Sequence, residues 1–128
     1  SLFSAMKDIA DFTVVDCSGD DDLISQMAVK QADYVVQMIT PDLKCMAYYS
    51  SHTDLFGSIA DRGIKVMCIR DKDLYLPKDE VAAHFKNISF TLPYSRMLKQ
   101  QVLTGTLSER LADRKYREQI AQISNRVV

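Results

Sequence analysis

The fold is decided by the stretch Asp11-Phe12-Thr13-Val14-Val15-Asp16-Cys17-Ser18-Gly19-Asp20-Asp21-Asp22. Four residues of core type, Phe12 to Val15, lead into Asp16, and a Cys-Ser-Gly turn with three more carboxylates follows. A short β-branched run that turn residues bound is typical of a buried strand. Open α/β sheets bind ligands at the carboxyl ends of their strands, so Asp16 falls where such a fold places a site.

Three further apolar runs downstream have the same character, and helical patterns separate them. Strands that alternate with helices indicate a parallel sheet whose connections cross over its faces. We therefore expect an α/β fold with a mostly parallel sheet of about four strands and flanking helices. The strands are predicted at 12–16, 34–39, 64–69 and 88–92, and the helices at 1–10, 22–31, 42–61, 77–85, 96–103 and 108–126, the last with Ser108 as its N-cap.

Size and composition place the chain among ordinary globular proteins. Its 128 residues are 47% hydrophobic and 26% charged, which is enough for a single α/β domain over 1–128 with a real core. The net charge of −1 gives no overall attraction to nucleic acid or anionic lipid. The apolar runs are too short to span a bilayer, and we expect a cytoplasmic location.

The cysteines and histidines form no motif. Cys17, Cys45 and Cys68 are odd in number and widely spaced, which is typical of free thiols rather than of a disulfide framework or a zinc site. A nucleophile at Cys17 would need His52 or His84 beside it, and neither histidine has a supporting motif. We expect both histidines to be surface or partly packed residues.

The order of the elements and their short sequence motifs resemble the C-terminal half of the MinD/ParA family of deviant-Walker P-loop ATPases. Within that family the resemblance is closest to divergent members of the CpaE/TadZ type. The resemblance covers nearly the whole chain and is carried by an ordered series of short motifs. These are the apolar run into Asp16 with its turn to Gly19, the sequence Gln31-Ala32-Asp33-Tyr34-Val35-Val36, the strand end Thr40-Pro41, and Leu92-Pro93-Tyr94-Ser95-Arg96 followed by Leu103-Thr104-Gly105.

The resemblance implies a partial P-loop NTPase (Rossmann-like) fold and a set of roles. Asp16 would be the Walker B aspartate that supports Mg²⁺, and Gly19 the glycine that senses the γ-phosphate. Arg70 stands where many members carry an asparagine that contacts the nucleotide base, and Pro93 and Tyr94 occupy the base-side loop. The family uses Mg²⁺ and ATP, dimerises, and positions pilus or secretion machinery, the division site or DNA.

One departure from the family is decisive for activity. The chain has four glycines, all isolated, so the Gly-rich phosphate loop with its lysine is absent. We therefore expect residues 1–128 to be the C-terminal portion of a larger ATPase domain. ATP hydrolysis would require an N-terminal half that carries the loop, and no cofactor is expected for this chain alone.

Two other functions stay open. The first is a non-catalytic pseudo-ATPase module for interaction or dimerisation, which is the second explanation of the missing loop. The second is a receiver-like phospho-acceptor domain with Asp16 at a strand end, although the acidic pair that such domains carry is missing. In each case we expect a homodimer and a protein partner. The basic residues between Arg96 and Arg126 add an expectation of weak membrane or DNA contact, against the simpler interpretation of a solvated helix face.

Overall fold

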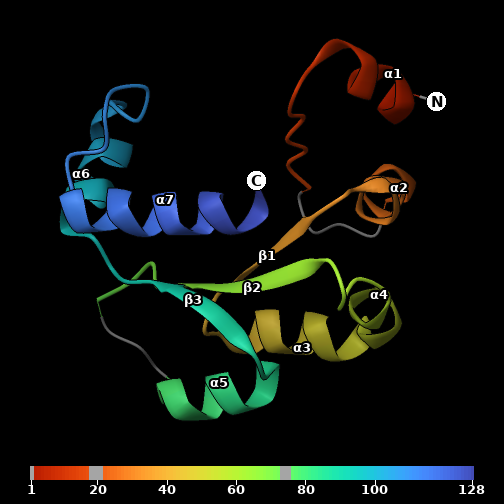
Figure 1. Ribbon diagram of the computed structural model, residues 1–128. Helices are drawn as coiled ribbons and strands as arrows, with labels where there is room; N and C mark the ends of the chain where they lie inside the picture. Colours follow the sequence, from red (N-terminus) through yellow and green to blue (C-terminus); the bar gives the residue numbers. More distant parts are fainter. Residues whose placement is uncertain (1, 18–21, 73–75) are drawn as a thin grey trace.

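The computed structural model describes residues 2–17, 22–72 and 76–128. Within them a three-stranded parallel sheet is flanked by helices, which confirms the predicted α/β class and the parallel sheet (Figure 1). In chain order the elements are α1 (Leu2–Ile9), α2 (Leu23–Gln31), β1 (Val35–Ile39), α3 (Leu43–Ser51), α4 (Thr53–Ser58), β2 (Gly63–Cys68), α5 (Lys78–Phe85), β3 (Ile88–Leu92), α6 (Arg96–Thr104) and α7 (Arg114–Val127).

The sheet has the strand order β1-β2-β3, so β2 is central and β1 and β3 lie at its edges. Ile39 of β1 pairs with Met67 of β2, and Cys68 of β2 pairs with Leu92 of β3. A register irregularity between β2 and β3 falls at Lys65 and Val66. Because all three strands are parallel, their carboxyl ends meet at one edge of the sheet.

Each face of the sheet has its own hydrophobic core. On one face Ile39, Met67 and Ile69 join Val81 and Phe85 of α5, and α3 packs beside them. On the other face α7 covers the sheet, and Figure 1 shows α7 above it with α3 and α5 below. The residues of this second core are Ile64, Val66 and Leu92, with Cys68, Phe90, Tyr116, Ile123 and Val127 packed against them.

The prediction of a strand at 12–16 is wrong. Residues 12–17 have no regular secondary structure, and Phe12 and Val14 keep 69% and 93% of their surface exposed. A strand is stabilised by pairing with a neighbour. Residues 12–17 do not pair with β1, whose outer edge stays without a partner among the described residues. The four predicted strands are therefore reduced to three.

The helix predicted over 42–61 is interrupted at His52, where φ is −124° and ψ is 34°. Two side chains compete there for one backbone carbonyl oxygen. Ser51 Oγ donates to Tyr48 O at 2.9 Å, and His52 Nδ1 lies 2.7 Å from the same oxygen. Side chains that bond nearby carbonyls weaken the helical alternative, so α3 ends and α4 begins anew.

The last helix begins at Arg114, and Ser108 is not its N-cap. Asp113 has that role, because its Oδ1 accepts a hydrogen bond from the Tyr116 backbone N–H at 3.1 Å. The connection before it is held by Gln101. The side chain of Gln101 accepts from Ala112 N at 3.0 Å and donates to Arg110 O at 3.2 Å. Residues 108–113, predicted to be helical, therefore form a connection that the Gln101 side chain bonds, and the helix starts after them.

Candidate functional site

The carboxyl edge of the sheet is the first candidate site, because open α/β folds bind ligands there. The segments that follow the strands are 40–42 after β1, 69–71 after β2 and 93–95 after β3. In Figure 1 this edge faces left, toward α6 and the start of α7. Two helices, α3 and α6, begin directly at it.

Three of the predicted site residues meet at this edge. Arg70 follows β2 and is exposed, and Pro93 and Tyr94 follow β3. Tyr94 is half-buried and packs against the core formed with α5, while Lys99 Nζ lies 6.0 Å from the centre of its ring. The parallel topology therefore places a guanidinium and a phenol at neighbouring strand ends.

The other predicted site residues are not gathered there. Asp16 is exposed and ends the extended segment that follows α1. In Figure 1 that segment lies on the right, near α1 and α2, apart from the edge where the strands end. Gly19 lies outside the described residues. In the described structure Asp16 is therefore not at a strand end and does not face Arg70 or Tyr94.

A hydrogen-bonded pair at the edge joins two helices and was not predicted. Ser95 is buried, with 7% of its surface exposed, and its Oγ accepts from Leu98 N at 3.1 Å as the N-cap of α6. The same Oγ donates to Asp113 Oδ2 at 2.7 Å, and Asp113 caps α7. Ser95 and the Tyr116 backbone N–H together lower the pKa of Asp113. The only sign of this pair in the sequence is that serine and aspartate are both residue types that favour the N-cap position of a helix.

Two weakly acidic groups lie under α7 near this pair. Burial raises the pKa of the Cys68 thiol, against a smaller opposite effect of the Arg70 charge. Burial also raises the pKa of the Tyr116 phenol, and the neighbouring Cys68 adds to the shift. Both groups are therefore protonated at neutral pH, so Cys68 is a packing residue and not an activated nucleophile.

At both helix starts on this edge one first-turn N–H is already bonded to a capping side chain. Asp42 Oδ1 accepts from Cys45 N at 2.7 Å and caps α3, and Ser95 caps α6 in the same way. The Asp42 carboxylate would repel a phosphate at the α3 start. Within 2–17, 22–72 and 76–128 no three His, Cys, Asp or Glu side chains are grouped to hold a metal ion.

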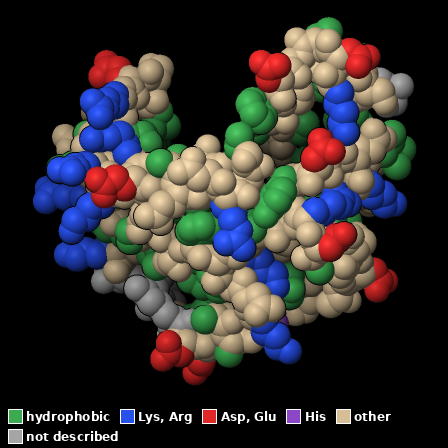
Figure 2. All heavy atoms as spheres, in the orientation of Figure 1, with side chains coloured by type: hydrophobic (Ala, Val, Ile, Leu, Met, Phe, Trp, Pro, Cys, Tyr) green, Lys and Arg blue, Asp and Glu red, His purple; other side chains and the backbone are tan. Residues whose placement is uncertain are grey.

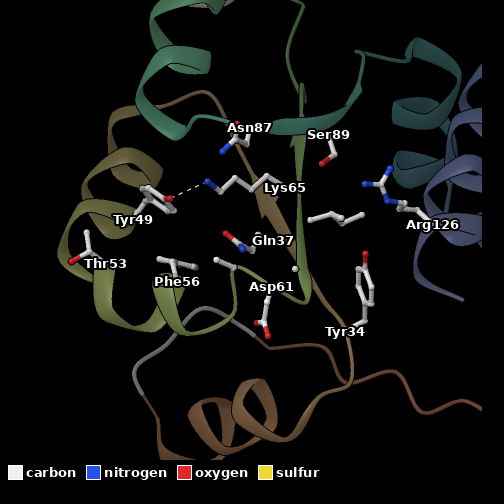
Figure 3. Close-up of a pocket in the computed structure, with 14 residues that line it drawn as sticks. Tyr34, Gln37, Tyr49, Thr53, Phe56, Asp61, Lys65, Asn87, Ser89 and Arg126 are labelled. Atoms are coloured by element: carbon white, nitrogen blue, oxygen red, sulfur yellow. Dashed lines mark hydrogen bonds between the residues drawn. The ribbon is translucent and has the colours of Figure 1, made fainter.

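A cavity of about 470 Å³ lies at the opposite, amino edge of the sheet (Figure 3). A polar network centred on Lys65 lines it. Lys65 Nζ points along it and donates to Tyr49 Oη at 3.0 Å, Phe85 O at 2.6 Å and Lys86 O at 3.1 Å. Gln37 Oε1 is buried beside it with no hydrogen-bond partner in the described structure.

The Lys65 network is structural. The ammonium group caps the last carbonyls of α5, where the negative end of the helix dipole favours a cation. Its three donors are used by these partners, whereas Gln37 Oε1 could accept from a small polar molecule or water in the cavity. Sequence reasoning missed this network because its members come from β2, α3 and the end of α5.

The histidines are structural as well. His84 Nε2 lies 3.2 Å from Ser50 Oγ and 3.3 Å from Met46 O. A nitrogen that donates to a carbonyl oxygen cannot accept a proton from a serine, so this pair does not activate a nucleophile. His52 stacks on Tyr48 with ring centres 4.0 Å apart. None of the described helices is both long and apolar enough to cross a membrane.

No protein-family model matches the chain, and comparison with curated proteins and with solved structures gives no significant match.

Proposed function

We propose that the chain is the C-terminal half of a MinD/ParA-like ATPase that positions a cellular structure such as pilus or secretion machinery, the division site or a DNA molecule. The ordered series of family-like motifs supports the proposal, from the run into Asp16 to the turn at Gly105. Three of the predicted strands form a parallel sheet, as such a half would require. The complete protein would act in the cytoplasm together with a protein partner.

One observation carries the proposal. The outer edge of β1 has no partner strand among the described residues, and Val36 and Met38, which share one face of β1, are 38% and 57% exposed. In the same molecule the strand-like residues 12–15 are exposed and pair with nothing in the described structure. A free apolar edge and a free apolar strand segment together indicate that part of the sheet is missing. We infer that the N-terminal half supplies at least one strand there.

The roles of the site residues follow from this completed sheet. We assign Mg²⁺ support to Asp16, phosphate sensing to Gly19, and the base side of the nucleotide site to Arg70, Pro93 and Tyr94. In the described structure Asp16 is apart from the other residues, so the N-terminal half would also have to order the segment that carries it. Bound Mg²⁺ would neutralise phosphate charge during hydrolysis.

Mutation of Asp16 in the complete protein tests the proposal. Asp16→Ala should reduce ATP hydrolysis to background, because no other carboxylate is assigned to the metal. Asp79→Ala is the matched control, since Asp79 is an exposed carboxylate on α5, and it should leave turnover unchanged. Unchanged turnover in Asp16→Ala would remove the Walker B assignment, and the absence of any ATPase activity in the complete protein would remove the proposal.

A non-catalytic interaction module is the second candidate, and the capped helix starts favour it. Asp42 and Ser95 each occupy one first-turn N–H at the carboxyl edge, and the Asp42 carboxylate disfavours an anion there. The parent reading frame separates the two candidates. A glycine-rich loop with a lysine upstream of residue 1 favours the ATPase, and a start codon near residue 1 favours the module.

A further inference from the structure

The cavity at the amino edge of the sheet contains a polar group that the fold itself does not use. Gln37 Oε1 is buried and has no hydrogen-bond partner in the described structure. Folded proteins pair nearly all buried polar atoms, because an unpaired one gives up its bonds to water without replacement. An apolar residue of similar volume would avoid this cost at the same position of β1. The unpaired oxygen therefore points to a partner that enters from the cavity.

The cavity has the size of a small-molecule site. Its volume is about 470 Å³, whereas a water molecule occupies about 30 Å³ and pockets for small organic molecules measure about 300 to 1,000 Å³. Tyr49 and Phe56 line one side, with their ring centres 4.8 Å apart and their planes at 28°. Figure 3 shows the Gln37 side chain extending from β1 toward these two rings. Aromatic rings beside an available amide suit a flat molecule with polar groups on its rim.

The surroundings of Gln37 leave its amide in a defined place. Gln37 pairs with Lys65 across β1 and β2, and Gly63 lies one step back along β2. A Cβ at Gly63 would lie 3.1 Å from Gln37 Nε2 and 3.0 Å from Ile59 O, so a larger residue would have to displace one of them. The glycine therefore makes the room in which the Gln37 amide lies.

The cavity wall beyond Lys65 has a strained backbone. Lys86 and Asn87 have φ angles of 52° and 53°, in the left-handed region that favours glycine, and Asn87 lines the cavity. Lys65 Nζ holds this turn by donating to Phe85 O at 2.6 Å and Lys86 O at 3.1 Å. Strained residues that neighbouring contacts hold in place are concentrated at binding sites. This wall is therefore a rigid one against which a ligand can rest.

The charges around the cavity favour a neutral ligand. Its charged residues are Asp61, Lys65 and Arg126. The three donors of Lys65 are used within the protein, and Asp61 and Arg126 are exposed, so water screens both. Figure 2 shows Lys and Arg side chains beside Asp and Glu side chains on the right of the molecule, over α2 and α4, so neither charge dominates near the amino edge. The group available for recognition in the buried part is the neutral Gln37 amide.

We propose that this cavity binds a small, flat, neutral molecule that carries an N–H donor next to a hydrogen-bond acceptor. Gln37 Oε1 accepts from that donor and Gln37 Nε2 donates to that acceptor, which is the paired arrangement by which a glutamine side chain recognises adenine. Aminopurine bases and aromatic primary amides both present such a pair. The cavity is at the amino edge of the sheet and the nucleotide site proposed above is at the carboxyl edge, so this proposal does not rest on the ATPase proposal.

Titration of the 128-residue chain with small probes, followed by heteronuclear NMR of its amide groups, tests the site. Adenine and nicotinamide are the probes for the two sources of the donor–acceptor pair. Purine and nicotinate are their matched controls, because they lack the amino group of adenine and the amide nitrogen of nicotinamide. At least one probe should shift the Gln37 side-chain amide and the Gly57 backbone amide saturably, since both residues line the cavity. Its matched control should bind at least about tenfold more weakly, because Gln37 Oε1 then stays unpaired.

The variant Gln37→Leu separates recognition from structure. It keeps the approximate volume of the side chain and removes the amide, so the probe should bind at least about tenfold more weakly, as read from the Gly57 signal. Its urea midpoint should equal or exceed that of the wild type, because the Gln37 oxygen makes no hydrogen bond within the described structure that the variant could lose. Lys44→Met, at an exposed position of α3, is the control and should bind like the wild type.

Binding of adenine alone assigns the site to a purine base, and binding of nicotinamide alone assigns it to an aromatic amide. Four results would each overturn the proposal: no saturable shift with either probe, equal binding of a probe and its matched control, shifts confined to the strand ends at 69–71 and 93–95, or wild-type binding by Gln37→Leu. A lower urea midpoint in Gln37→Leu would overturn it as well, because the amide would then be structural. No titration contains Mg²⁺ or phosphate, so failure here leaves the ATPase proposal unaffected, and failure of the ATPase proposal leaves this site unaffected.

Discussion

Ser95 Oγ donates a hydrogen bond to Asp113 Oδ2 at 2.7 Å, and these two side chains are also the N-caps of α6 and α7. The pair therefore ties the starts of two helices to the end of β3. Because Ser95 is buried, its hydroxyl has no ready replacement from solvent.

Removal of the Ser95 hydroxyl should destabilise the fold. Ser95→Ala leaves Leu98 N without its cap and Asp113 Oδ2 without its donor, so we expect a loss of about 1–2 kcal/mol in the free energy of unfolding. Urea denaturation followed by circular dichroism measures it. Ser124→Ala, at an exposed position of α7, is the control and should change stability by less than about 0.5 kcal/mol. Equal stability of both variants would show that the cap pair does not stabilise the fold.

Acid should weaken the same contact. The pKa of Asp113 is below the ordinary value of 3.8, first because of the Ser95 hydrogen bond and then because of the Tyr116 N–H. A carboxyl whose pKa is lowered by folding stabilises the native state above its unfolded pKa, and this contribution is lost as the pH falls through the folded value. Asp113→Asn should therefore flatten the decline of the urea midpoint below about pH 4. Asp79→Asn serves as the control, and identical pH profiles for wild type and Asp113→Asn would contradict the assignment.

The two valines Val14 and Val66 test the corrected fold. Val66 is fully buried under α7, whereas Val14 is 93% exposed. Val66→Ala should cost about 2 kcal/mol of stability, and Val14→Ala less than about 0.5 kcal/mol. Thermal or urea denaturation separates the two. A loss at Val14 as large as that at Val66 would restore the strand that the sequence predicts at 12–16.

Lys65 should stabilise the end of α5 through its two hydrogen bonds to Phe85 O and Lys86 O. Lys65→Met keeps the length of the side chain and leaves the carbonyls of Phe85 and Lys86 without their donor. We expect a loss of about 1–3 kcal/mol, with faster amide hydrogen exchange in the last turn of α5. Lys44→Met on the surface of α3 is the matched control. Unchanged exchange in α5 would show that the ammonium group does not cap the helix.

The sequence predicts well the strands whose position follows from a short apolar run and the turn residues on either side of it. The strand at Ile88–Leu92 has the predicted bounds, β1 begins one residue later than predicted, and β2 is shifted by one residue at both ends. Each is a mainly apolar run between turn residues that is paired in the sheet. Residues 12–16 have the same local pattern but no neighbouring strand. A sequence pattern shows what a segment would bury and not whether a partner strand is present.

For the candidate site, the order of the elements predicts which residues share an edge of the sheet, but not which side chains form hydrogen bonds. Arg70 and Tyr94 fall at one edge because parallel strands end together, which follows from the order of elements alone. The Ser95–Asp113 pair and the Lys65 network join residues 16 to 21 positions apart in different elements. Such contacts depend on how the helices pack, so no local pattern indicates them.

Calorimetric titration of Mg²⁺-ATP into the complete protein and into the 128-residue chain tests the central proposal most directly. We expect micromolar binding by the complete protein and no measurable heat of binding for the 128-residue chain, which has no phosphate loop and whose helix starts are capped by Asp42 and Ser95. Micromolar binding by the 128-residue chain on its own, or no binding by the complete protein, would contradict it.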